Sequence, residues 1–280
     1  HLFLKDDIEN KNIDLDTQKF KNNFIKISEN KNLTRQKFLF CVYLSYHLTL
    51  NRDCNYINTM VHHSHGTEET KRFLDDFKNS RLLITIRDPR ANLKSGISNW
   101  INYDKKKDNQ RHFYFYIKRI RENLKFAKKQ INKKFFVKLE EANDIDIKKK
   151  LSDFLGINFN PEIMRATFAG KTWPGDKLSR FQSKDGSYNK KSLNNQWESF
   201  FSGKDKLILG LIYNDYRLFG YKIDKINWRQ MTSIFFLIPL PFAFDKKLFS
   251  LKYYFSTNIS MKKKAVDIFF YIKRIFYFYK

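Results

Sequence analysis

The stretch that most constrains the fold runs from Arg81 to Trp100, with the sequence RLLITIRDPRANLKSGISNW. It begins with an apolar, partly β-branched run at 82–86, which is typical of a strand buried on both faces of a parallel sheet. Asp88 then offers an N-cap oxygen, and Pro89 has the fixed φ that suits a first helical position. The stretch therefore predicts a strand, a tight turn and a helix.

Such a turn brings helix N-terminal N–H groups to the carboxyl end of a strand, where open α/β sheets bind anions. Arg87 lies at the turn, and Ser95 follows Asp88 by 7 residues, close to two helical turns. We therefore expect the Arg87 guanidinium and the Ser95 hydroxyl to converge on one phosphate. The same residues also fit an ordinary capped helix, with Arg87 in a surface ion pair and Ser95 in contact with solvent.

This order of residues resembles a known family. An apolar strand, Arg-Asp-Pro-Arg at 87–90 and then Ser95 are similar to the 3′-phosphate-binding segment of sulfotransferases that use 3′-phosphoadenosine 5′-phosphosulfate (PAPS). The resemblance implies that Arg87 and Ser95 hold the 3′-phosphate of PAPS, the co-substrate. It also implies the fold class, which is α/β with a central parallel sheet flanked by helices, of the P-loop NTPase-like sulfotransferase type.

A second stretch carries an independent resemblance. The apolar run KFFVKL at 134–139 predicts a buried strand, Glu140 follows it, and residues 144–155 predict a helix that ends at Gly156. This order of strand, acidic residue, helix and Phe-Leu-Gly-Ile turn is similar to the middle of the sulfotransferase fold. The resemblance implies that Glu140 is a structural carboxylate near the nucleotide.

Three histidines, His62, His63 and His65, stand close together in the sequence HHSHG. They fit a solvated loop, a set of metal ligands or a general base, which a histidine titrating near neutral pH can provide. No cysteine or carboxylate cluster completes a zinc pattern, so we expect no metal. In many sulfotransferases a catalytic histidine precedes the phosphate-binding arginine by about the 22 residues that separate His65 from Arg87. The resemblance implies His65 as the catalytic base, with His63 as the second candidate.

A loop-like stretch, TFAGKTWPGDKLS at 167–179, contains Lys171 and Trp173. Its Gly-Lys-Thr lacks the earlier glycine and the preceding strand of a Walker loop, so it is not interpreted as one. Similar Gly-x-x-Trp-x-Gly loops lie near the acceptor in bacterial and carbohydrate sulfotransferases. The resemblance implies that Lys171 and Trp173 contact the acceptor substrate.

The resemblance covers residues 55–221, and one element of the family is missing from it. Sulfotransferases bind the 5′-phosphosulfate with an N-terminal strand, a loop rich in Gly and Ser/Thr, and a helix. The sequence begins at His1 without such a segment. We therefore expect an N-terminally truncated version of the fold, which is inactive if the segment is truly absent.

Charge points to an anionic partner, because the formal net charge of the 280 residues is +25. The basic residues are dispersed and match no nucleic-acid-binding motif, so no nucleic-acid partner is expected. The two cysteines, Cys41 and Cys54, have neither disulfide-framework nor metal-site spacing and fit a reduced compartment.

The C-terminal tail, residues 231–280, differs from the catalytic domain expected at 1–230. Its apolar run at 233–244 contains two prolines and is shorter than the roughly 20 residues of a membrane-spanning helix. Residues 261–280 predict a basic, aromatic amphipathic helix. This helix fits an anionic membrane surface and also fits docking on the protein core. We expect a cytoplasmic protein, peripheral on the inner face of a membrane, with the Golgi lumen as the alternative for a eukaryotic source.

Together these patterns predict a sulfotransferase that moves a sulfuryl group from PAPS to a hydroxyl of a carbohydrate or lipid-linked acceptor. His65 removes the acceptor proton, while Arg87 and Ser95 orient the donor. Two alternatives from other classes remain open. They are a basic nucleic-acid-binding protein and a membrane-surface interaction module without catalysis.

Overall fold

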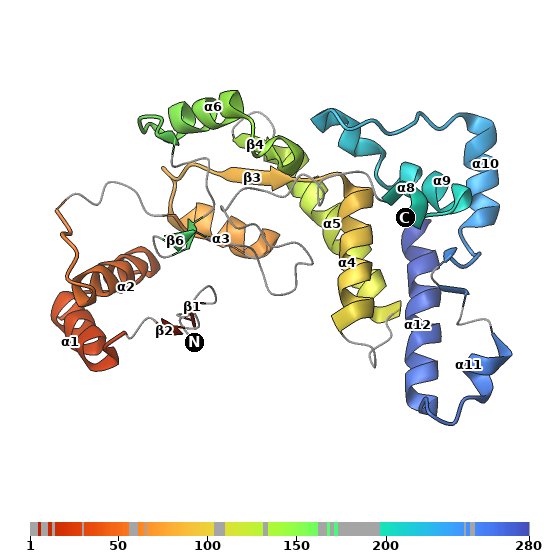
Figure 1. Cartoon of the computed structure of the whole chain (residues 1–280), viewed down its shortest axis with the longest axis horizontal. Helices are drawn as coiled ribbons and strands as arrows, with labels where there is room; N and C mark the ends of the chain where they lie inside the picture. Colours follow the sequence, from red (N-terminus) through yellow and green to blue (C-terminus); the bar gives the residue numbers. More distant parts are fainter. Residues whose placement is uncertain are drawn as a thin grey trace. The chain divides into compact units, whose positions relative to one another are not determined.

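A computed structural model of the chain describes residues 5–6, 11–12, 15–29, 31–55, 61–64, 66–103, 110–130, 134–161, 167–168, 171–172, 197–243, 245–246 and 250–279 (Figure 1). The chain divides into two compact units, residues 1–81 and 82–280. The described part is mostly helical, and each of its sheets has two strands.

The first unit contains a short antiparallel pair and three helices: β1 (Lys5–Asp6), β2 (Lys11–Asn12), α1 (Thr17–Ser28), α2 (Arg35–Thr49) and α3 (Thr67–Asp76). Thr34 is the N-cap of α2, because its side chain accepts a hydrogen bond from the Lys37 N–H. Helices α1 and α2 pack on each other, and the rings of Phe24 and Phe38 meet edge to face at 5.5 Å. Capping, an aromatic contact and a hydrogen bond from Asn23 to Thr49 thus contribute to this helix pair.

The second unit carries the remaining described elements. They are β3 (Leu83–Ile86), α4 (Pro89–Tyr103), α5 (Gln110–Gln130), β4 (Phe135–Lys138), the 3-10 helix η1 (Leu139–Glu141), α6 (Ile145–Leu155), β5 (Thr167–Phe168), β6 (Lys171–Thr172), α8 (Trp197–Phe200), α9 (Gly203–Ile212), the 3-10 helix η3 (Asn214–Phe219), α10 (Trp228–Leu237), α11 (Leu251–Phe255) and α12 (Met261–Phe278).

Strands β3 and β4 form the parallel sheet, paired in register from Leu83 opposite Phe135 to Ile86 opposite Lys138. The predicted burial of the first strand on both faces is wrong. Leu83 is 41% exposed, whereas Ile84 and Ile86 pack against the core. Among the described strands β3 has a single neighbour, and the core covers only one of its faces. The run is therefore apolar on both faces but buried on one.

The main core lies between α4, α5, α9 and the C-terminal helices. Helix α5 buries Phe113, Ile117, Ile120, Leu124 and Ala127 on one stripe. Helix α4 approaches α5 so closely at Gly96 that an added Cβ would collide with the ring of Tyr116.

The C-terminal segment belongs to this core. Its residues Ile234, Ile238, Phe242 and Phe278 are buried in the same hydrophobic cluster as the residues of α5. The compact units divide at residue 81, whereas the sequence interpretation separated 231–280 from the rest. In the structure the last helix is docked on the core, which was one of the two alternatives that the sequence left open.

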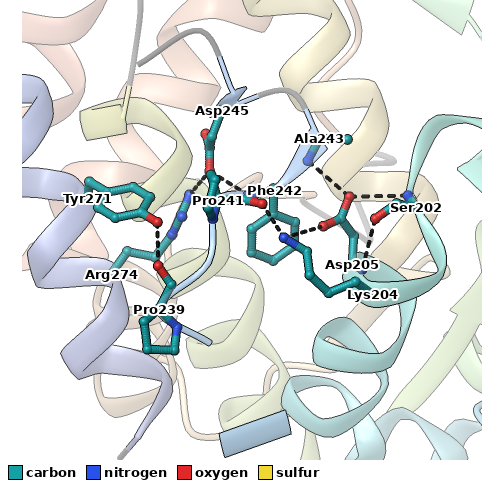
Figure 2. A network of polar contacts seen from close by, with 10 residues as sticks. All are labelled: Ser202, Lys204, Asp205, Pro239, Pro241, Phe242, Ala243, Asp245, Tyr271 and Arg274. Atoms are coloured by element: carbon teal, nitrogen blue, oxygen red, sulfur yellow. Dashed lines mark hydrogen bonds and ion pairs between the residues drawn. The ribbon is translucent and has the colours of Figure 1, made fainter. Parts of the chain in front are cut away.

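The turn that follows α10 is anchored to α9. Asp205 accepts hydrogen bonds from the N–H groups of Ser202 and Ala243, both at 3.1 Å, and Lys204 donates to the carbonyl of Pro241 (Figure 2). Because Ser202 caps α9 and Ala243 belongs to the turn, one buried carboxylate joins the two segments. None of the helices in the described ranges combines the length and apolar character that a membrane span requires.

Candidate anion site at the β3–α4 corner

The corner between β3 and α4 has the local structure that the sequence predicts. The Asp88 carboxylate accepts a hydrogen bond from the Arg90 N–H at 2.8 Å, and the Asp88 carbonyl accepts from the Asn92 N–H at 2.8 Å. Pro89 is the first residue of α4 and has no N–H to satisfy. Asp88 is therefore a buried N-cap that fixes where the helix begins.

The parallel register brings β4 to the same corner. Because Ile86 lies opposite Lys138, the residues that follow both strands meet at one sheet edge. There the Glu140 carboxylate accepts hydrogen bonds from the Asp88 N–H at 2.9 Å and from the Tyr221 hydroxyl at 2.8 Å. Glu140 therefore joins the ends of both strands, and its predicted place near a bound nucleotide remains a prediction.

Tyr221 reaches this carboxylate through a special backbone position. Gly220 ends η3 with a φ of 76°, in the left-handed region that favours glycine. Burial, and then the neighbouring Glu140 carboxylate, raise the pKa of Tyr221 well above its ordinary value. The phenol therefore stays neutral and remains a hydrogen-bond donor to Glu140.

Arg90 is a corner residue to which sequence reasoning gave no role. Its guanidinium forms two hydrogen bonds with the Asp88 carboxylate, at 3.0 and 2.6 Å, and donates to the carbonyl of Lys222 at 2.9 Å. The guanidinium carbon also lies 3.9 Å from the ring centroid of Trp197. The signal was present as the second arginine of Arg-Asp-Pro-Arg, but two of its partners, Trp197 and Lys222, lie more than a hundred residues further along the chain.

Two of the backbone N–H groups at this corner already have partners within the protein. The N–H of Asp88 is bonded to Glu140, the N–H of Arg90 is bonded to Asp88, and Pro89 has none. The protein's own carboxylates thus occupy these two donors, which are not available to an anion.

The two predicted phosphate-binding residues belong to this corner. Arg87 is half-buried and directly follows β3, while Ser95 is half-buried on α4, close to two turns after Asp88. The helix thus begins where the spacing argument required. That both side chains contact one phosphate remains a prediction, and a positive fork beside a hydroxyl suits a dianionic oxygen group.

The predicted bases belong to the other compact unit. His63 is exposed, and the neighbouring His62 is exposed and stacks on Phe73 with ring centroids 4.8 Å apart. His65, the preferred base, lies outside the described residues. The pairing of a histidine base with Arg87 therefore remains a prediction.

The predicted acceptor residues are described only in part. Lys171 lies in β6, where its backbone pairs with Phe168 of β5. Trp173 lies outside the described residues. The acceptor site remains a prediction.

Within the ranges that the structure does describe, no group of three His, Cys, Asp or Glu side chains is arranged to hold a metal ion.

Comparisons with known proteins returned no relative. No family model matches the chain, and no match was found among curated proteins or solved structures. The functional interpretation therefore depends on the residues and the geometry of the corner.

Proposed function

We propose that the chain is a PAPS-dependent sulfotransferase with the P-loop NTPase-like α/β fold of that family. The proposed acceptor is a hydroxyl of a carbohydrate or of a lipid-linked molecule. The observation that carries this proposal is the parallel pairing of β3 with β4, which brings Arg87 and Glu140 to one sheet edge at the start of α4. Carboxyl edges of parallel strands are where such sheets bind nucleotides.

The proposed chemistry is an in-line transfer. A bond forms between the acceptor oxygen and sulfur while the bond between sulfur and the bridging phosphate oxygen breaks. His65, or His63 in its place, accepts the proton of the acceptor hydroxyl. Arg87 and Ser95 bind the 3′-phosphate and so orient the donor for attack. Lys171 and Trp173 contact the acceptor.

The corner network supports this proposal by holding the strand ends and α4 in place. The pair of Asp88 and Arg90 is nearly buried, with side chains 8% and 13% exposed. Its charges compensate each other, and Glu140 is held by the Asp88 N–H and the Tyr221 hydroxyl. In the proposed site these contacts fix the backbone at Asp88, the residue that follows Arg87. A fixed backbone reduces the entropy lost when the phosphate binds.

The direct test is calorimetric titration of the full chain with adenosine 3′,5′-bisphosphate, the product of the donor. We expect binding that Arg87→Ala weakens by a factor of about 10–100, because a hydrogen bond to a charged group contributes about 1.5–3 kcal/mol. Arg217→Ala is the matched control, since Arg217 is an exposed arginine on η3 of the same unit. Ser95→Ala should weaken binding less than Arg87→Ala, because it removes a neutral group.

Two results would overturn the proposal. One is failure of the unaltered chain to bind the bisphosphate, and the other is equal affinity of the Arg87→Ala variant. Tight, salt-sensitive binding of RNA or DNA without any response to the bisphosphate would instead identify a nucleic-acid-binding protein. In an active preparation, His65→Ala should lower the rate by about 10²–10⁴ without a comparable loss of bisphosphate affinity.

A further inference from the structure

Helix α12 packs on the protein with an unusual stripe. The residues that it buries follow each other at spacings of three and four, and most of them are polar: Lys264, Asp267, Tyr271, Arg274 and Phe278. An ordinary surface helix of a globular protein buries an apolar stripe instead. Helix α12 therefore turns a mostly polar stripe toward the protein, which is the opposite of an ordinary amphipathic surface helix.

Arg274 is the centre of this stripe and is fully buried. Its guanidinium binds the Asp245 carboxylate at 2.5 Å and the Gln110 side-chain oxygen at 3.2 Å. Figure 2 shows Arg274 beside Asp245 and Tyr271, and the Tyr271 hydroxyl donates to the carbonyl of Pro239 at 2.6 Å. The rings around the guanidinium are those of Phe113, Phe242, Tyr271 and Phe278. Aromatic faces and a carboxylate thus compensate the buried charge.

The first half of α12 is held in the same way. The Lys264 ammonium donates to the carbonyls of Tyr254 and Ser256, at 2.6 and 3.0 Å, at the end of α11. The Asp267 carboxylate accepts from the Tyr253 hydroxyl at 2.6 Å. These contacts specify the polar side of α12 as the inner side along its length.

The opposite side of α12, called the outer face here, carries mostly apolar exposed side chains. Phe269 is 57% exposed and Phe276 is 65% exposed, and they are accompanied by Met261, Val266, Ile268 and Ile272. Helix α10 adds exposed aromatic side chains next to the end of α12. There the Tyr279 hydroxyl donates to the carbonyl of Phe235, and the two rings are tilted against each other with centroids 4.9 Å apart. Exposed apolar side chains in such number mark an interaction surface.

The exposed charges of the segment that carries the outer face all have one sign. Residues 228–280 contain two acidic residues, Asp245 and Asp267, and both are buried, at 1% and 2% exposure. The exposed charged residues described in this segment are basic: Arg229, Lys246, Lys252, Lys262 and Lys273. The outer face therefore combines aromatic and aliphatic side chains with a positive border.

We propose that the outer face of α12, together with the exposed aromatic residues of α10, inserts into the surface of an anionic lipid membrane. Aromatic and aliphatic side chains would enter the headgroup and acyl boundary while the lysines remain at the anionic headgroups. This binding mode lies on the membrane and does not span it. The proposal does not depend on the proposed sulfotransferase activity.

The charge pattern favours a membrane over the other occupants of such a face. A second copy of the chain would bring two positive borders together, and like charges across an interface oppose association. A neutral apolar partner would account for Phe269 and Phe276 but not for the exposed basic residues of the same segment. An anionic lipid surface matches both features of the face.

The test is co-sedimentation of the full chain with vesicles of phosphatidylcholine alone and with vesicles that also contain phosphatidylserine. We expect binding to the anionic vesicles, weakened as salt is added. The variant Phe269→Ser/Phe276→Ser should lower the binding constant at least tenfold. The variant Lys262→Gln/Lys273→Gln should lower it by about fivefold per lysine. Phe40→Ser, at a phenylalanine of α2 that is 52% exposed, is the matched control and should bind normally.

The lysine variant keeps the test valid if the phenylalanine variant fails to fold, which its circular dichroism would reveal. Absence of binding to anionic vesicles overturns the proposal, as does equal binding to both vesicle types. Unchanged binding by both the folded phenylalanine variant and the lysine variant has the same meaning. Sedimentation velocity tests whether a second copy of the chain covers the outer face. A dimer of the unaltered chain that becomes a monomer in the phenylalanine variant would assign the outer face to self-association instead.

Discussion

Helices α5 and α12 pack against each other and have matching periodicity, yet they bury opposite kinds of side chain. Helix α5 buries an apolar stripe from Phe113 to Ala127 and turns lysines outward. Helix α12 buries a stripe at the same three-and-four spacing that contains Lys264, Asp267 and Arg274. Two helices with one geometry thus contribute to one unit in opposite ways.

The difference shows that periodicity identifies two faces but does not choose the inner one. An apolar stripe is buried because leaving water is favourable in itself. A polar stripe is buried only where each group meets a partner, and here Asp245, Tyr253 and the end of α11 supply those partners. The choice between the two faces depends on residues outside the helix.

The strongest test of this difference between α5 and α12 is to remove Arg274, the member of the buried pair with Asp245 that belongs to α12. We expect Arg274→Met to lower the free energy of unfolding by about 3–5 kcal/mol, because it leaves the Asp245 carboxylate buried without its charge partner. Urea denaturation measures the loss, with Lys273→Met, at the exposed neighbouring residue, as the control. The double variant Arg274→Met/Asp245→Leu should recover much of it. A loss below about 1 kcal/mol in the single variant would contradict this account.

The matching change in α5 tests the ordinary stripe. Leu124→Ala should cost about 2–5 kcal/mol of unfolding free energy, since Leu124 is 3% exposed and the change leaves a cavity. Lys125→Ala, at the next and exposed position, should change it by less than about 0.5 kcal/mol. Unlike the change at Arg274, this loss should not be recovered by altering any polar residue. Such recovery would mean that the two stripes are stabilised in the same way.

A smaller effect, with a pH signature, is expected at Tyr271. Burial raises the pKa of Tyr271 to about 12. An unfolded tyrosine loses its proton near pH 10, so above that pH the unfolded state binds fewer protons and stability falls as the pH rises towards 12.

Tyr271→Phe should remove this contribution to the alkaline loss of stability. At neutral pH it should cost only about 0.5–1.5 kcal/mol, for the hydrogen bond to the carbonyl of Pro239. Denaturation curves at several alkaline pH values, with Tyr254→Phe as an exposed control, measure both effects. An unchanged alkaline slope in Tyr271→Phe would show that other tyrosines account for it.

The smallest effect is expected on the outer face of α12. Phe276→Ser should change the free energy of unfolding by less than about 0.5 kcal/mol, although two positions later Phe278→Ala should cost about 3–5 kcal/mol. Thermal or urea denaturation of the two variants compares the faces directly. A large loss in Phe276→Ser would mean that the outer face stabilises the fold and is not a free surface.

At the level of local structure, much could be predicted from the sequence. The N-cap at Asp88 and the glycine that ends α6, Gly156 in a left-handed conformation, are present as expected. Each of these features depends on residues within a few positions of each other. The candidate site could be placed at the β3–α4 corner for the same reason.

The rest needed partners that are distant in the sequence. Arg90 bonds to Lys222 and stacks on Trp197, and Glu140 receives Tyr221, so no spacing in the corner sequence indicates these roles. The one-sided burial of β3 likewise depends on which strands and helices surround it.

The sequence by itself determined the elements, their caps and the period of their faces, because these follow from backbone geometry and short-range hydrogen bonds. Only the tertiary structure decided which face of α12 is turned inward. That decision required a carboxylate from residue 245 and the aromatic rings of three segments to meet at Arg274, and burial of a charge is favourable only where such partners converge.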